Sequence, residues 1–161
     1  AAHGVALIVG TTGFSPEQRE EIRLAVEGHV PAVISSNYSV GVNIFWTLIR
    51  EAARRLPEGY DIEVTEAHHR YKKDAPSGTA KTILEILDEE VGPRTHLHGR
   101  EGMMERGDEI GVHVIRGGDI VGDHTVLFAG NYEVLELSHR AYDRGVFASG
   151  AVRAAAWVIG R

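Results

Sequence analysis

Residues 66–80 read Glu-Ala-His-His-Arg-Tyr-Lys-Lys-Asp-Ala-Pro-Ser-Gly-Thr-Ala, and this segment separates two regular patterns. Before it, apolar residues alternate at Tyr60, Ile62 and Val64, as in a half-buried strand. After it, apolar residues recur at helical spacing from Ala80 to Val91. The segment is therefore expected to be a loop that connects a strand to a helix.

Basic side chains are concentrated in this loop, although the whole chain has a net charge of -6. They are His68, His69, Arg70, Lys72 and Lys73. Such a local density indicates either an anionic partner or a fully solvated loop. Histidine titrates near neutral pH, so two histidines beside a lysine could also donate protons.

The end of the segment has the pattern of a helix start. Asp74-Ala75-Pro76 is typical of a turn, and Ser77 is the expected N-cap. Gly78 would let a ligand approach the backbone, while the first free amides and the hydroxyls of Ser77 and Thr79 can bind a carboxylate or phosphate. The alternative is a solvated basic loop before an ordinary capped helix.

The same residues resemble a known signature. EAHHRYKKDAPSGTA fits E-(A/L)-H-H-x-x-K-x-D-A-P-S-G-T-A, the signature of the dihydrodipicolinate reductase family, at every fixed position. The similarity continues at 9–14, 37–43, 116–125 and 147–153. It implies an NAD(P)H-dependent oxidoreductase of lysine (diaminopimelate) biosynthesis that reduces 4-hydroxy-tetrahydrodipicolinate or dihydrodipicolinate to tetrahydrodipicolinate. It also implies a cytoplasmic location and, for the full-length enzyme, a homotetramer built through the second domain.

The resemblance assigns roles to individual positions. His68 and Lys72 occupy the catalytic positions, with His68 as general acid and Lys72 supporting protonation or polarising the ring. The positions that bind the dicarboxylate substrate are His69, Ser77, Gly78 and Thr79. The positions near NADH or NADPH, after two strands, are Gly10, Thr11, Thr12, Gly13, Ser36, Asn37 and Tyr38.

The family pattern begins with a glycine-rich pyrophosphate loop that this sequence does not contain. We therefore interpret the chain as a fragment, and the choice between NADH and NADPH cannot be predicted because the selecting residue follows the second strand of the missing part. The expected domains are 1–37, the C-terminal part of a Rossmann-type dinucleotide-binding domain, and 38–148, a substrate-binding and oligomerisation domain. Residues 149–161 are expected to form a helix that packs back toward the first domain.

Composition limits the other possibilities. The acidic balance argues against binding to nucleic acid or to a membrane surface. The absence of cysteine excludes disulfides and thiolate chemistry, and it fits a reducing cytoplasm. No apolar run approaches the roughly 18 residues of a membrane span. His96, His98, His113 and His124 complete no recognisable metal-ligand spacing, so no metal is expected and these histidines are interpreted as structural or exposed.

In the first part of the chain, residues 5–9 and 31–35 are continuous apolar runs, expected as parallel strands buried on both faces. Ser15, Pro16 and Gln18 together predict a capping box and a helix start. Ile22, Ala25 and Val26 are expected to face inward, and Gly28 to end that helix. Another helix is expected over 42–56.

In the second part, 92–108 is interpreted as a mobile, irregular loop. Residues 109–116, 119–128 and 132–140 are expected as strands that pair antiparallel, with a tight turn at Gly117-Gly118. A last helix is expected over 145–158. The predicted fold class is α/β plus α+β: the remnant of a Rossmann-type parallel sheet, then a mixed or antiparallel sheet with helices on one face.

Two other functions remain open from the sequence. The chain could be a non-catalytic module that binds a dicarboxylate or mediates oligomerisation. It could also be a related dehydrogenase acting on an aldehyde, but that chemistry needs a nucleophilic cysteine or another base, and cysteine is absent.

Overall fold

The computed structural model describes residues 3–161, which divide into two compact units. Unit 1 contains residues up to Val40 together with Arg144–Arg161, and unit 2 contains Gly41–Asp143. The predicted functional domains 1–37, 38–148 and 149–161 remain a prediction. No helix within residues 3–161 is long and apolar enough to cross a membrane.

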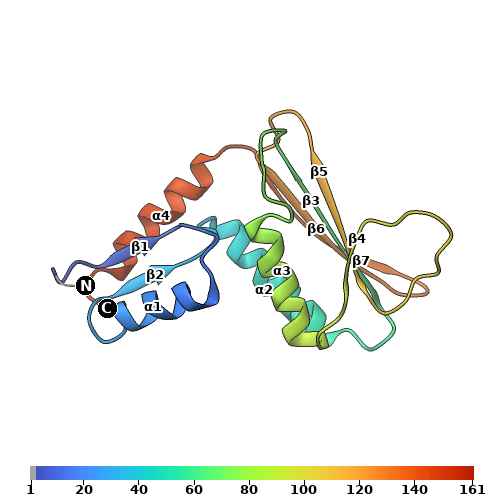
Figure 1. Ribbon diagram of the computed structural model, residues 1–161, viewed down its shortest axis with the longest axis horizontal. Helices are drawn as coiled ribbons and strands as arrows, with labels where there is room; N and C mark the ends of the chain where they lie inside the picture. The colour runs from blue at the N-terminus through green and yellow to red at the C-terminus, as the bar shows by residue number, and fades with distance from the viewer. Residues whose placement is uncertain (1–2) are drawn as a thin grey trace. The chain divides into compact units, whose positions relative to one another are not determined.

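Unit 1 is built on two short parallel strands, β1 (Leu7–Val9) and β2 (Ala32–Ile34). They are joined by α1 (Pro16–Val26), and α4 (Gly145–Val158) returns to both strands (Figure 1). At the start of α1, the Ser15 side chain accepts from the Gln18 amide and the Gln18 side chain accepts from the Ser15 amide. The predicted capping box is therefore confirmed.

Burial in unit 1 is lower than the sequence predicts. β1 is only half-buried along its length, and Ile34 of β2 is exposed. α1 has no buried residue, and Ala25, which was expected to face inward, is exposed. The physical reason is that a sheet of two strands covers few apolar side chains, so apolar sequence alone does not produce burial here.

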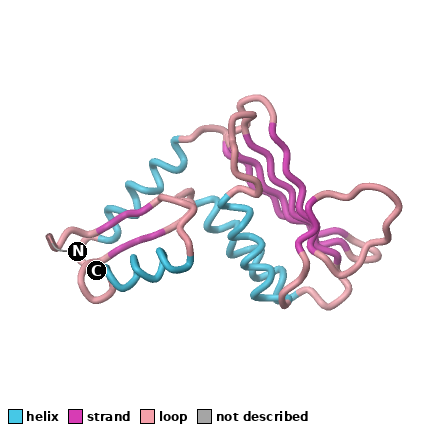
Figure 2. Tube along the Cα trace, in the orientation of Figure 1, coloured by secondary structure: helices cyan, strands magenta, loops and turns pink. Residues whose placement is uncertain are grey.

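Unit 2 is a five-stranded mixed sheet in the order β4-β5-β3-β6-β7. Figure 2 shows the strands in magenta. Its strands are β3 (Asp61–His68), β4 (His96–His98), β5 (Ile110–Arg116), β6 (Gly122–Ala129) and β7 (Val134–Ala141). β3 pairs parallel with β5 and antiparallel with β6, and β6 pairs antiparallel with β7. The predicted α/β plus α+β class is confirmed.

The expected antiparallel hairpin of 109–116 with 119–128 is wrong, because β3 lies between β5 and β6. The connection after β5 instead passes over the end of β3, where the Gly117 amide donates to the His68 carbonyl (3.0 Å) and the Arg70 amide donates to the Gly118 carbonyl (3.1 Å). A short connection fits either arrangement. The helix between β3 and β5 supplies the crossover that a parallel pair needs.

The expected mobile loop over 92–108 contains β4, which pairs parallel with β5 at the sheet edge. Three residues with histidine at both ends show no apolar alternation, so the sequence did not indicate this strand. The Arg106 guanidinium holds the following loop by donating to the carbonyls of Ile62 (3.1 Å) and Glu109 (2.8 Å).

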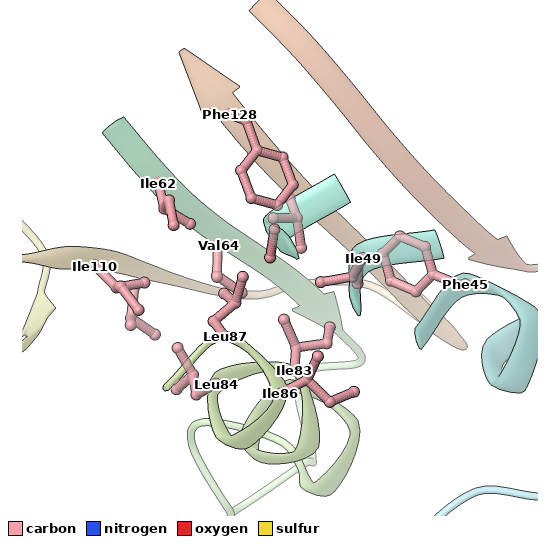
Figure 3. Close-up of a cluster of buried hydrophobic side chains, with 13 residues drawn as sticks. Phe45, Ile49, Ile62, Val64, Ile83, Leu84, Ile86, Leu87, Ile110 and Phe128 are labelled. Atoms are coloured by element: carbon pink, nitrogen blue, oxygen red, sulfur yellow. The ribbon is translucent and has the colours of Figure 1, made fainter. Parts of the chain in front are cut away.

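Two helices, α2 (Val40–Arg55) and α3 (Gly78–Val91), cover one face of the sheet (Figures 1 and 2). The core cluster lies between them and the strands (Figure 3). Ile49, Ile83, Leu87, Val64, Ile110 and Phe128 are all essentially inaccessible to solvent. This layer fixes β3 and α3 against each other, and both meet at the 66–80 segment.

Candidate functional site

The 66–80 segment leaves the sheet at the C-terminal end of β3 and enters α3. The Ser77 hydroxyl accepts from the Ala80 amide (3.2 Å), so Ser77 is the N-cap of α3 as its sequence predicts. His68 and Ser77 are buried, His69 and Lys72 are half-buried, and Lys73 is exposed. The predicted strand-loop-helix arrangement is therefore present.

Glu66 is the centre of the hydrogen bonds in this segment, and its side chain is fully buried. Its carboxylate accepts from His68 Nδ1 (2.5 Å), from Arg116 Nη1 and Nη2 (2.8 Å each) and from the Ser77 amide (3.0 Å). Burial alone would raise the pKa of Glu66, but these donors outweigh burial and hold the pKa at about 2. The carboxylate is therefore charged at neutral pH.

His124 lies beside this cluster, although the sequence placed it among structural or exposed histidines. Its ring is edge-on to that of His68, with centroids 5.1 Å apart, and its Nε2 is 3.1 Å from the Ser77 hydroxyl. Burial, followed by the charge of His68, lowers the pKa of His124 to about 3. His124 is thus neutral, and it contacts both the His68 ring and the Ser77 N-cap of α3.

The basic side chains of the segment have different contacts and do not gather around one point. Lys72 Nζ donates to both carboxylate oxygens of Asp74 (2.8 Å each), and that hydrogen bond lowers the pKa of Asp74. The His69 ring lies 6.3 Å from that of Tyr71, and Arg70 is exposed. Arg116, which no sequence argument singled out, forms an ion pair with Glu66 through both terminal nitrogens.

The two predicted substrate-binding residues after Ser77 lie in the first turn of α3. Thr79 is buried and Gly78 is half-buried. The amides at this helix end are in the place where an anion would be bound by a helix N-terminus. Within unit 2 the structure therefore brings His68, Ser77, Gly78 and Thr79 to one end of the sheet.

The residues predicted near the cofactor form two loops in unit 1. Gly10, Thr11, Thr12 and Gly13 follow β1 and are exposed, and Ser36, Asn37 and Tyr38 follow β2. Because the strands are parallel, both loops lie at the same end of this sheet. The Tyr38 hydroxyl bonds the carbonyls of Val9 (2.9 Å) and Val33 (2.7 Å), which ties the second loop across both strand ends.

A separate cavity of about 450 Å³ lies near β4 and contains none of the motif residues. Its lining residues are Pro93, Arg94, Thr95, Leu97, Met104, Glu105, Asp108 and Glu109. Among residues 3–161, no group of three or more histidine, cysteine, aspartate or glutamate side chains could hold a metal ion.

Comparisons with known proteins match both parts of the chain to one family. The family described as dihydrodipicolinate reductase, C-terminus, matches residues 41–161, and the one described as dihydrodipicolinate reductase, N-terminus, matches residues 1–38. The 4-hydroxy-tetrahydrodipicolinate reductases of Methanoculleus marisnigri and Methanoregula boonei are 79% and 76% identical over all of this chain. The chain spans 64% and 63% of their lengths.

A solved structure, the dipicolinate-bound dihydrodipicolinate reductase from Paenisporosarcina sp. TG-14, is similar in fold. It is 28% identical, the TM-score is 0.74, and the match covers 96% of this chain and 60% of the other.

Proposed function

Since the chain belongs to the dihydrodipicolinate reductase family, we propose that it acts in the reduction of 4-hydroxy-tetrahydrodipicolinate or dihydrodipicolinate to tetrahydrodipicolinate, with NADH or NADPH as the reductant. The observation that supports this most directly is the Glu66 carboxylate, which accepts from both His68 and the Ser77 amide. A potential proton donor and a helix N-terminus suited to a carboxylate are thus held in one network.

The substrate is a ring with two carboxylates, and the charges of unit 2 suit it. The start of α3 would bind one carboxylate through the amides of Gly78 and Thr79 and the hydroxyls of Ser77 and Thr79, while the Ser77 amide holds Glu66. His69 would add a further donor. Lys72 would leave Asp74 for the bound dianion, and its charge would polarise the ring or support protonation.

Reduction of the ring requires a hydride at one carbon and a proton at the adjacent carbon. A bound reduced nicotinamide would supply the hydride. His68, protonated on both ring nitrogens, would supply the proton from Nε2 and become neutral, because its Nδ1 proton stays in the hydrogen bond to Glu66. The protein otherwise contributes orientation and charge.

The loops of unit 1 fit part of a nicotinamide nucleotide. The backbone of Gly10, Thr11, Thr12 and Gly13 is exposed, and a Cβ built on Gly13 would meet nothing within 4 Å. Loops at the carboxyl ends of parallel strands are the usual place for such a ligand. Gly10, Thr11, Thr12 and Gly13, with Ser36, Asn37 and Tyr38, would hold it there.

The second candidate is a dicarboxylate-binding or oligomerisation module without catalysis.

The sheet face opposite α2 and α3 favours assembly under either candidate function. Ile115 (50% exposed) and Val134 (59% exposed) are apolar residues that point to that face by strand alternation. We propose that this face contacts other copies in a homotetramer. Sedimentation of the chain over a range of concentrations tests it, and a monomer at every concentration contradicts it.

The test of the main proposal is a calorimetric titration of pyridine-2,6-dicarboxylate, with and without NADH, together with an assay of NADH oxidation on the substrate. We expect binding in the wild type and a loss of at least tenfold in affinity in Lys72→Ala. Lys73→Ala is the matched control, since Lys73 is the exposed neighbour. Binding without turnover would favour the module, and no binding by a folded chain would contradict both the reductase and a dicarboxylate-binding module.

A further inference from the structure

Glu66 takes no direct part in the hydride or proton transfer proposed above, yet its carboxylate is charged and fully buried. Its side chain is 0% exposed, and both of its oxygens accept from nitrogen donors. A buried carboxylate persists only when donors replace the lost water. Here those donors come from three different elements.

The first donor is His68, two residues along β3 itself. The second is Arg116 at the end of β5, whose two terminal nitrogens form a bidentate pair with the carboxylate. The third is the Ser77 amide at the start of α3. Arg116 Nη2 also donates to the Asp74 carbonyl (2.8 Å), so the turn before α3 is held by the same group of contacts.

These contacts fix the ring of His68 as well as its place. The hydrogen bond to Glu66 requires a proton on Nδ1, so Nε2 is the nitrogen that remains to exchange a proton. Space beside Nε2 is left by Gly122: a Cβ built there would lie 3.1 Å from Nε2 and 3.5 Å from Cδ2 of His68. The edge-on ring of His124 closes another side.

We propose that Glu66, held by Arg116, is a positioning residue that orients Nε2 of His68 and fixes the N-terminus of α3 relative to it. The inference rests on the proposed function for the identity of the reaction that uses this geometry. Its consequence is that one buried carboxylate sets the relation between the proton donor and the carboxylate-binding helix end.

The test uses the full 161-residue chain and two readouts, one of which does not depend on turnover. Long-range ¹H–¹⁵N spectra of the histidine side chains report which ring nitrogen carries the proton. In the wild type we expect the neutral His68 ring to be protonated on Nδ1, and in Glu66→Gln we expect a mixture of both tautomers. Protonation of the neutral wild-type ring on Nε2 would overturn the proposal without any variant.

The second readout is steady-state kinetics with NADH across pH. For Glu66→Gln we expect kcat to fall by roughly 100-fold and its pH profile to change, as for loss of an oriented acid, while KM changes by less than about tenfold. A merely structural role would lower the folded fraction and leave the kcat of folded molecules and its pH profile unchanged. That result would overturn the proposal.

A matched control is available on the same strand. Glu63 accepts from His113 Nε2 (2.7 Å), so Glu63→Gln should change the His113 spectrum and leave the His68 spectrum and kcat as they are. If Glu66→Gln fails to fold because Arg116 is left without its anion, Glu66→Gln with Arg116→Met removes both charges and should show the same mixed tautomer and low kcat. A wild type that has the Nδ1 tautomer but no turnover would support the positioning role and contradict the proposed reaction.

Discussion

Two glutamates of β3 each accept from a histidine and an arginine, but their surroundings differ. Glu66 bonds His68 and Arg116, and its side chain is 0% exposed. Glu63 bonds His113 and Arg106, and its side chain is 21% exposed. By strand alternation the two side chains lie on opposite faces, Glu66 on the helix-covered face and Glu63 on the open one.

The comparison shows that a glutamate, a histidine and an arginine in contact behave differently when the glutamate is fully buried and when it is partly exposed. Around Glu66 the donors replace water, so the charge is fixed and the histidine ring has one orientation. Around Glu63 water still competes, and Arg106 is held as much by the backbone carbonyls of Ile62 and Glu109 as by the carboxylate. We therefore expect the contacts around Glu63 only to stabilise the position of the loop after β4.

The largest expected difference is between the two arginines. Arg116→Ala leaves the Glu66 charge buried without its bidentate partner, so we expect a loss of roughly 3–5 kcal/mol in the free energy of unfolding. Arg106→Ala leaves a partly solvated carboxylate and should cost about 1 kcal/mol. Urea denaturation of both variants measures this, and equal losses would contradict the comparison.

The next effect is on the pH dependence of stability. The folded-state pKa of His124 is about 3 against an ordinary 6.5, so the unfolded chain binds more protons below pH 6.5 and stability falls as pH decreases. Glu66, with a pKa of about 2 against 4.5, adds to the loss only below about pH 4.5. By pH 5 the His124 contribution should reach about 2 kcal/mol.

The measurement is the midpoint of urea unfolding between pH 7 and pH 5. His124→Gln should flatten most of the slope, and the remaining slope would come from His139, whose pKa is also lowered by burial. A wild-type stability that is constant over this range would contradict the neutral, buried state of His124.

His124 also shows where prediction from sequence succeeded and where it stopped. The strand before the motif, the Ser77 cap and α3 were predicted because their signals lie within a few residues of one another. His124 and Ser77 are 47 residues apart, and Glu66 and Arg116 are 50 apart. Those contacts depend on strand order, which short connections alone leave undetermined.

The error in strand order therefore led to the omissions in the site. With β5 expected beside β6, nothing placed Arg116 next to Glu66, although both lie within segments that resemble the family. In unit 1 the opposite happened: apolar runs correctly predicted β1 and β2, but burial on both faces needs neighbours that a two-stranded sheet does not provide.

A smaller loss of stability is expected at Ser77, the N-cap of α3, whose amide bonds Glu66. Ser77→Ala removes the hydroxyl that accepts from the Ala80 amide and contacts His124, while the Ser77 amide can still donate to Glu66. We expect a loss of about 1–2 kcal/mol. Ser15→Ala, at the exposed cap of α1, is the matched control and should cost about 0.5–1 kcal/mol, measured by the same denaturation.

The smallest effect on stability is expected at the glycines that face the two clusters. A Cβ at Gly111 would lie 1.6 Å from a Glu63 oxygen, which is the end of a flexible side chain that can move toward solvent. A Cβ at Gly122 would lie 3.1 Å from His68 Nε2, on a ring held at Nδ1 by Glu66. Each alanine should change the free energy of unfolding by less than about 1 kcal/mol.

The two variants should differ in which histidine resonances shift and in whether turnover falls. Gly122→Ala should shift the His68 side-chain resonances and lower turnover, because the ring can yield only by lengthening its bond to Glu66. Gly111→Ala should shift the His113 resonances and leave turnover unchanged, because Glu63 carries its contact away with it. If Gly122→Ala left the His68 resonances in place, the ring would have freedom that the buried cluster is argued to remove, and the contrast between the two faces of β3 would fail.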